Sequence, residues 1–93
     1  MTRRAEILET ARHIVTQDRN VTHGEPENIH RQIVAGWAAL DEARGDRPRD
    51  ASDAALYMAW LKLVRASANP QHIDSVIDAA GYAAIAGEIA SNA

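Results

Sequence analysis

Alanine supplies 19 of the 93 residues, whereas phenylalanine is absent and only four residues are aromatic. Alanine has the highest helix propensity, and its small side chain lets helices approach one another closely. A core of alanine, leucine and isoleucine buries less apolar area than an aromatic core, and each buried Å² contributes only about 25 cal/mol. A chain of this length is already short of buried surface. The sequence therefore predicts an all-α domain that completes its core by homo-oligomerisation.

Charge and residue types exclude several classes of function. The formal net charge is −3 and the pI is about 5.7, so we expect no direct DNA binding, which requires a basic surface. The absence of cysteine excludes disulfides, thiolate nucleophiles and cysteine-ligated zinc. No apolar run approaches the roughly 18 residues of a membrane span, and none follows the basic start Met1–Glu6. These features predict a cytoplasmic protein with no signal peptide and no membrane partner.

Apolar residues recur at helical spacing in four segments. We expect one domain over residues 1–93, with helices over residues 3–17, 26–43, 52–66 and 71–91. Pro26 suits the first turn of the second helix, and Gly36 lies beside the apolar stripe of that helix, where it allows a close neighbour. Asp50 or Ser52 caps the third helix, and Asn69–Pro70 breaks the chain after it. The pattern predicts a small four-helix bundle.

The third and fourth expected helices carry charged residues on matching faces. Lys62 and Arg65 are three residues apart and share one face of the third helix. Asp74, Asp78 and Tyr82 recur every four residues along one face of the fourth helix. An antiparallel hairpin sets the two cations beside the two carboxylates. Asp74 also lies in the first turn of its helix, where the helix dipole favours an anion.

Two interpretations of this charged group stay open at this stage. In one, the side chains form a structural ion-pair network, which contributes little to stability where water reaches it. In the other, Lys62 and Arg65 bind phosphate, while Asp74 and Asp78 orient them or hold a magnesium ion.

A polar loop before the second helix is a second candidate for ligand binding. The residues concerned are Asp18, Arg19, His23, Gly24 and Asn28. The free backbone N–H groups of a helix N-terminus suit an anion such as phosphate. The competing interpretation is a capped turn between helices with no ligand. Residues 45–51 form a charged connection to which we assign no chemistry.

Other catalytic signatures are missing from the sequence. The four histidines show no paired metal-binding spacing, and no serine, histidine and acid set indicates a nucleophilic triad. No Gly-x-x-x-x-Gly-Lys loop is present either.

Over nearly its full length the sequence resembles a family of short phage and prophage proteins that carry a domain of unknown function. The segments that carry the resemblance are Ile7–Leu8, Asp18–Arg19, Asn28, Trp37, Met58–Arg65, Asn69–Pro70, Asp74–Ser75 and Asp78–Ala83. One departure concerns the glycine loop, where family members usually carry a tyrosine and an aspartate and this sequence has His23 and Glu25. The departure puts a stacking role for position 23 in doubt. The resemblance implies a cytoplasmic location in a bacterial host.

The part of the sequence from Met58 to Ala83, which holds Lys62, Arg65 and the two aspartates, is more distantly similar to the all-α nucleoside triphosphate pyrophosphatases of the MazG type. Those enzymes hold magnesium with two acidic pairs, and Asp74 and Asp78 stand roughly where the second pair would lie, at spacing four instead of three. The expected helix over residues 26–43 has no Glu-x-x-Glu. Hydrolysis of a phosphoanhydride requires metal or cations to neutralise the developing charge. With half of the acidic set missing, the resemblance implies phosphate binding without catalysis.

The sequence thus favours a small phage-type protein that associates with itself and binds a nucleotide or other phosphate-bearing small molecule without turnover. This interpretation requires no cofactor. One alternative is a magnesium-dependent nucleotide pyrophosphohydrolase. The other is a structural or protein-binding helical module.

Overall fold

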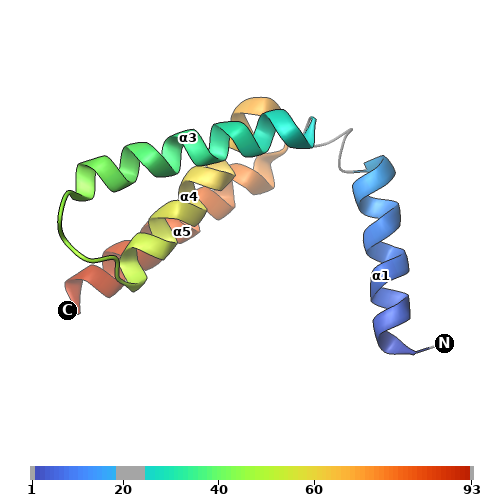
Figure 1. Ribbon diagram of the computed structural model, residues 1–93, viewed down its shortest axis with the longest axis horizontal. Helices are drawn as coiled ribbons and strands as arrows, with labels where there is room; N and C mark the ends of the chain where they lie inside the picture. Colours follow the sequence, from blue (N-terminus) through green and yellow to red (C-terminus); the bar gives the residue numbers. More distant parts are fainter. Residues whose placement is uncertain (1, 19–24, 93) are drawn as a thin grey trace.

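A computed structural model describes residues 2–18 and 25–92 of the chain, and its regular secondary structure there is entirely helical. The elements are α1 (Arg3–His13), a π-helical turn η1 (Ile14–Asp18), α3 (Pro26–Arg44), α4 (Ala51–Ala68) and α5 (Ile73–Ser91). The predicted all-α class and the four α-helices are therefore confirmed within the described ranges (Figure 1). No helix among these residues combines the length and the apolar character needed to cross a membrane.

Local sequence explains where the helices begin and end. The Thr2 hydroxyl accepts a hydrogen bond from the backbone N–H of Ala5 at 3.3 Å and caps α1. Asp50 and Asp53 form a reciprocal capping box at the start of α4, so Asp50 rather than Ser52 is the cap. Gly45 ends α3 with a φ of 68°, a left-handed conformation that glycine adopts without a steric penalty.

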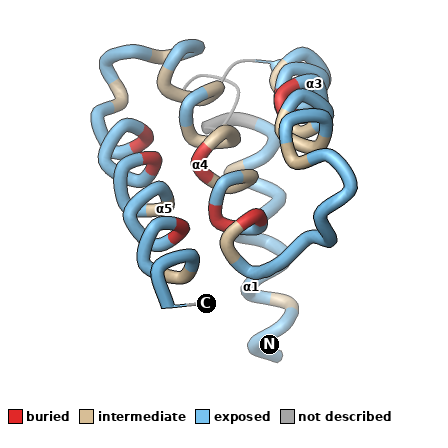
Figure 2. The backbone as a smooth tube through the Cα atoms, turned by 90° about the vertical axis from the view of Figure 1, so that its left-hand side faces the viewer, coloured by how far each residue is buried: buried red, intermediate tan, exposed pale blue. Residues whose placement is uncertain are grey.

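Helix α4 lies between α3 and α5 (Figure 2). It runs alongside α5 over most of its length, whereas α3 crosses it (Figure 1). The buried apolar residues of the described chain are few and mostly small: Ile33, Ala55, Ala59, Ala79 and Ala86. Four of the five are alanines, so α4 and α5 pack through short side chains, as the alanine content predicts.

The α3–α4 contact is built around two tryptophans. The Trp60 indole N–H donates to the backbone carbonyl oxygen of Gln32 at 3.1 Å, and the Trp37 indole N–H donates to the backbone carbonyl oxygen of Tyr57 at 3.0 Å. A β-carbon at Gly36 would overlap the Trp60 ring, so this position must be glycine for the indole to lie against α3. The predicted close neighbour of Gly36 is confirmed.

Helix α1 differs from the others because it lies apart from α3, α4 and α5 (Figure 1). Its apolar residues bury little surface: Ile7 is 54% exposed and Leu8 is 68% exposed. In the described chain, α3, α4 and α5 therefore pack together, and none of these three helices covers the apolar side of α1.

Candidate functional site

The hairpin of α4 and α5 brings together two of the charged residues that the sequence singled out, Lys62 and Asp78. Lys62 Nζ lies 2.9 Å from Asp78 Oδ2 across the two helices. The Lys62 side chain is only 19% exposed, whereas that of Asp78 is 47% exposed. The predicted approach of a third-helix cation to a fourth-helix acid is thus seen at this pair.

Three further predicted residues lie on neighbouring turns of the same hairpin. Arg65 follows Lys62 by three residues and is half-buried, as is Tyr82 on α5. Asp74 is exposed in the first turn of α5, one turn before Asp78. We call these five residues, Lys62, Arg65, Asp74, Asp78 and Tyr82, the polar face of the hairpin.

The loop candidate lies mostly beyond the part of the chain that the structure describes. Arg19, His23 and Gly24 fall outside the described residues, and so does the side chain of Asp18, which ends η1. Asn28 is exposed in the first turn of α3. The role of this loop in a ligand site stays a prediction.

The metal prediction rests on two carboxylates. Among the described residues, no group of three or more acidic or histidine side chains gathers in a way that could hold a metal ion. Asp74 and Asp78 remain a pair, and Asp78 already contacts Lys62. Magnesium often uses only one or two protein carboxylates and takes its other ligands from water and substrate phosphates. These two residues could therefore contribute to a magnesium site only together with a phosphate ligand.

Sequence reasoning missed a second charged cluster, at the connection between α3 and α4. Arg47 donates two hydrogen bonds to Asp53, at 2.7 and 2.9 Å, although Asp53 is only 5% exposed. Asp53 Oδ2 also accepts from the backbone N–H of Asp50 at 2.9 Å. The Arg47 guanidinium and this backbone bond hold the pKa of Asp53 below its usual range. The connection between the helices is thus fixed by a bidentate ion pair.

The same connection contains a second ion-pair group centred on Asp41. The Tyr57 hydroxyl donates to Asp41 Oδ1 and accepts from Arg44 and from Arg49, each at 2.9 Å. Asp41 also accepts from Arg44 at 2.7 Å and from Arg49 at 3.0 Å. The Tyr57 hydrogen bond, followed by that of Arg44, lowers the pKa of Asp41 to about 2.

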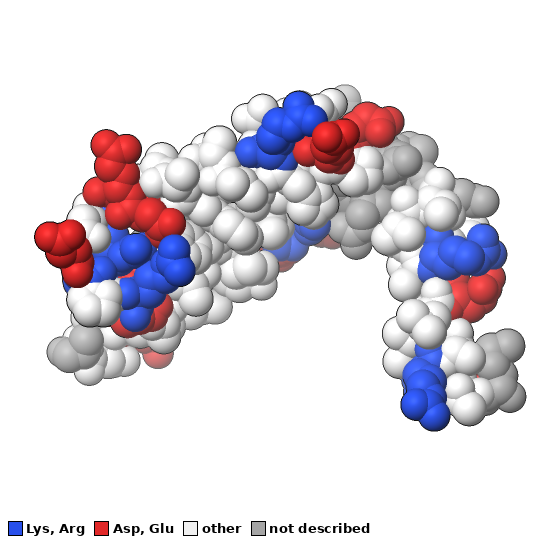
Figure 3. Space-filling view, in the orientation of Figure 1, with Lys and Arg blue, Asp and Glu red and all other residues white. Residues whose placement is uncertain are grey.

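We call Asp41, Arg44, Arg47, Arg49, Asp53 and Tyr57 together the α3–α4 clasp. In Figure 3 charged side chains gather at this connection, and an uncharged stretch of surface separates them from further charged side chains that lie nearer to α1. Its three arginines form ion pairs with Asp41 and Asp53, so the clasp stabilises the connection between α3 and α4. One sequence signal could have indicated the role of Asp53 in this cluster. Asp53 follows Asp50 by three residues, and that spacing defines a capping box at a helix N-terminus.

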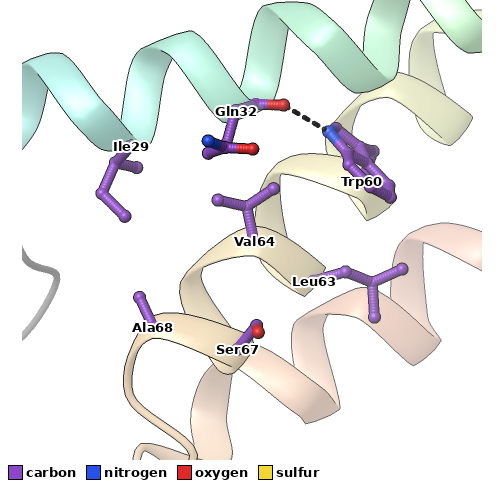
Figure 4. A pocket seen from close by; sticks show the side chains of 7 residues that line it. All are labelled: Ile29, Gln32, Trp60, Leu63, Val64, Ser67 and Ala68. Carbon is purple, nitrogen blue, oxygen red and sulfur yellow. Dashed lines mark hydrogen bonds between the residues drawn. The ribbon is translucent and has the colours of Figure 1, made fainter.

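An apolar groove of about 500 Å³ opens between α3 and α4. Its lining residues are Ile29, Gln32, Trp60, Leu63, Val64, Ser67 and Ala68 (Figure 4). None of them belongs to the polar face or to the clasp. Its lining is mostly apolar, which suits hydrocarbon surface better than a phosphate.

The sequence comparison identifies the family. A family model described as a domain of unknown function, DUF6378, matches residues 6–90. This chain belongs to the DUF6378 family. The Gene 55 protein of Mycobacterium phage L5 is 34% identical to it over 79 residues, which cover 85% of this chain and 49% of the phage protein. The DUF6378 chain therefore spans about half the length of this curated relative. No solved structure matches it. The predicted membership of a phage protein family is confirmed.

Proposed function

We propose that this DUF6378 protein binds a nucleotide or another phosphate-bearing small molecule at the polar face, without turning it over. The observation that carries the proposal is the 2.9 Å contact between Lys62 Nζ and Asp78 Oδ2, which holds a lysine of low exposure between two helices. Arg65 lies one turn further along α4.

The donors of Lys62 support this proposal. An ammonium group carries three N–H donors, and Asp78 occupies one of them, so two remain for phosphate oxygens. The side chain of Lys62 is mostly shielded from water, which strengthens its attraction for an anion. Arg65 supplies a planar guanidinium that can bind phosphate with two parallel hydrogen bonds. Tyr82 offers a ring and a hydroxyl one turn after Asp78 for the organic part of the ligand.

The distribution of acids supports binding rather than hydrolysis. Asp74 and Asp78 are two carboxylates on one helix, whereas the related catalytic arrangement would need a second acidic pair. Two acids of α3 are engaged elsewhere: Glu27 pairs with Arg31, and Asp41 belongs to the clasp. Magnesium would enter this site bound to the phosphates of the ligand.

Calorimetric titration of the purified protein tests the proposal. The probes are a nucleoside triphosphate, a cyclic dinucleotide and inorganic pyrophosphate, each with and without magnesium. We expect saturable binding of at least one probe, at least about tenfold weaker in Lys62→Ala, a loss of roughly 1.4 kcal/mol. The matched control is Arg31→Ala, which breaks an exposed ion pair on α3 and should leave binding unchanged.

Circular dichroism separates a lost ligand contact from a lost fold. Because lone partly exposed ion pairs contribute at most about 1 kcal/mol, Lys62→Ala should keep the helical content and a Tm within a few degrees of the original. The proposal is wrong if no probe binds at millimolar concentration, or if Lys62→Ala binds as well as the unaltered protein.

The catalytic alternative gives a different result in the same samples. A magnesium-dependent pyrophosphohydrolase would release pyrophosphate or monophosphate from the nucleoside triphosphate, and Asp78→Ala would abolish that release. Intact nucleotide after prolonged incubation with magnesium would exclude this alternative for the nucleotides used.

A protein-binding helical module is the second candidate, and a separate observation favours it. Ten large apolar side chains on the described helices are at least 40% exposed, among them Leu63, Ile73 and Ile77. An apolar surface of this kind marks interaction sites on soluble proteins. In this case substitutions at Lys62 and Arg65 would change no ligand response, and the apolar residues would carry the function.

A further inference from the structure

Two apolar surfaces of this chain face no partner within the described residues. One is the groove between α3 and α4, where Trp60, Leu63 and Val64 line a space of about 500 Å³ (Figure 4). The other is the apolar side of α1, which includes Ile7 and Leu8. Burying such surfaces is favourable by about 25 cal/mol per Å², so both have a reason to be covered.

The groove and α1 are similar in length, and both are apolar. The 11 residues of α1 rise about 16 Å along its axis, and the groove follows α4 from Trp60 to Ala68, which rises about 12 Å. Ile7 and Leu8 precede Ala11 by four and three residues on α1, so the three side chains form an apolar stripe that a groove of this length can receive.

The polar side of α1 carries two ion pairs within the helix. Arg3 pairs with Glu6 at 3.3 Å, and Arg12 pairs with Glu9 at 2.7 Å, both within the helix. These pairs join four charged side chains of α1 without help from another helix.

We propose that α1 of one copy docks in the α3–α4 groove of a second copy, whose own α1 fills the first groove. Helix α1 extends away from α3, α4 and α5, so it leaves the groove of its own chain open and is placed to reach a neighbour (Figure 1). An exchange of identical elements about a two-fold axis satisfies both copies at once and doubles the buried area. The second copy thus supplies the fourth helix of each bundle. The inference is independent of phosphate binding at the polar face.

Light scattering coupled to gel filtration measures the predicted assembly. One chain weighs 10.1 kDa, so the unaltered protein should elute with twice that mass. Leu8→Asp on α1 and Leu63→Asp in the groove should each yield the single-chain mass, because each places a carboxylate in the new contact. Leu8 and Leu63 are 68% and 50% exposed in one chain, so neither change disturbs that chain's own core. Ile77→Asp, on an exposed position of α5, is the matched control and should remain dimeric.

A mixture of the two variants distinguishes exchange between copies from docking within one chain. In an exchanged dimer, the intact α1 of the Leu63→Asp chain fits the intact groove of the Leu8→Asp chain. An equimolar mixture should therefore recover dimers through one of the two contacts, with an affinity at least about tenfold below that of the unaltered protein.

Three results would overturn the inference. A monomeric unaltered protein would mean that α1 docks in its own groove or in none. A dimer that Ile77→Asp breaks and Leu8→Asp spares would assign the interface to α5. A mixture of Leu8→Asp and Leu63→Asp that stays monomeric would exclude the exchange.

Discussion

Helix α4 contacts its two neighbours in two different ways. Its contact with α3 uses directional bonds: two indole N–H groups donate to backbone oxygens across the interface, and Gly36 leaves room for one of the rings. Its contact with α5 uses short apolar side chains, and the Lys62–Asp78 ion pair joins the two helices at the surface. Directional bonds fix the crossing of α3 on α4 at defined positions, whereas alanine packing brings α4 and α5 close over most of their length.

The polar groups on the two sides of α4 also differ in how many carboxylate acceptors their donors contact. In the α3–α4 clasp, Asp53 takes both hydrogen bonds of a bidentate arginine, and Asp41 takes donors from Tyr57 and two arginines. On the polar face, Lys62 shares one carboxylate. A cluster whose donors are matched to acceptors stabilises a fold, and one with spare donors can also bind a ligand. Charge density alone does not distinguish the two.

The largest effect should come from breaking the clasp. Arg47→Ala leaves the buried carboxylate of Asp53 without its bidentate partner, which is far more costly than losing an exposed pair. At a fixed protein concentration, we expect the Tm to fall by about 10 °C. Arg31→Ala is the control, because its ion pair with Glu27 is exposed, and it should lower the Tm by less than about 3 °C. Equal effects of the two substitutions in thermal unfolding would contradict the importance of the clasp.

A smaller effect should come from the close approach at Gly36. Gly36→Ala forces the Trp60 indole off α3 and should lower the free energy of unfolding by about 1–3 kcal/mol. Gly81→Ala on α5 is the matched control, because nothing lies within 4 Å of its added β-carbon. That change should raise the free energy of unfolding by up to about 1 kcal/mol through helix propensity. Urea unfolding measures both, and a neutral Gly36→Ala would show that the indole can move aside.

The smallest effect should be a pH dependence confined to the α3–α4 side. The pKa of Asp41 falls from 3.8 to about 2 in the folded chain, so its contribution to stability is complete above the unfolded value and is lost as the pH falls toward 2. We expect the urea midpoint to decrease between pH 4 and pH 2. Tyr57→Phe removes the largest cause of the shift, so it should flatten this part of the profile. An unchanged profile in Tyr57→Phe would mean that Asp41 is held by its arginines alone.

Sequence patterns anticipated much of the fold and part of the candidate site. Spacing of apolar residues predicted the helices, and the antiparallel register of the last two placed Lys62 near Asp78, as observed. Asp50, one of the two expected caps, is the observed cap, and the expected start at residue 52 lies one residue after the observed start at Ala51, which is the usual uncertainty of helix ends. The clasp escaped prediction because Asp41 and Tyr57 are 16 residues apart and meet only after the chain turns back on itself.

Composition and periodicity determined that this chain is helical, poor in large buried side chains and dependent on close helix contacts. The physical reason is that alanine has a high helix propensity and a side chain too short to fill a wide space between helices. Only the tertiary structure decided which charged side chains pair with one another. It also decided that α1 lies apart from the other helices and that a groove opens between α3 and α4. Those outcomes depend on distances between segments remote in the chain, and local residue patterns carry no such distances.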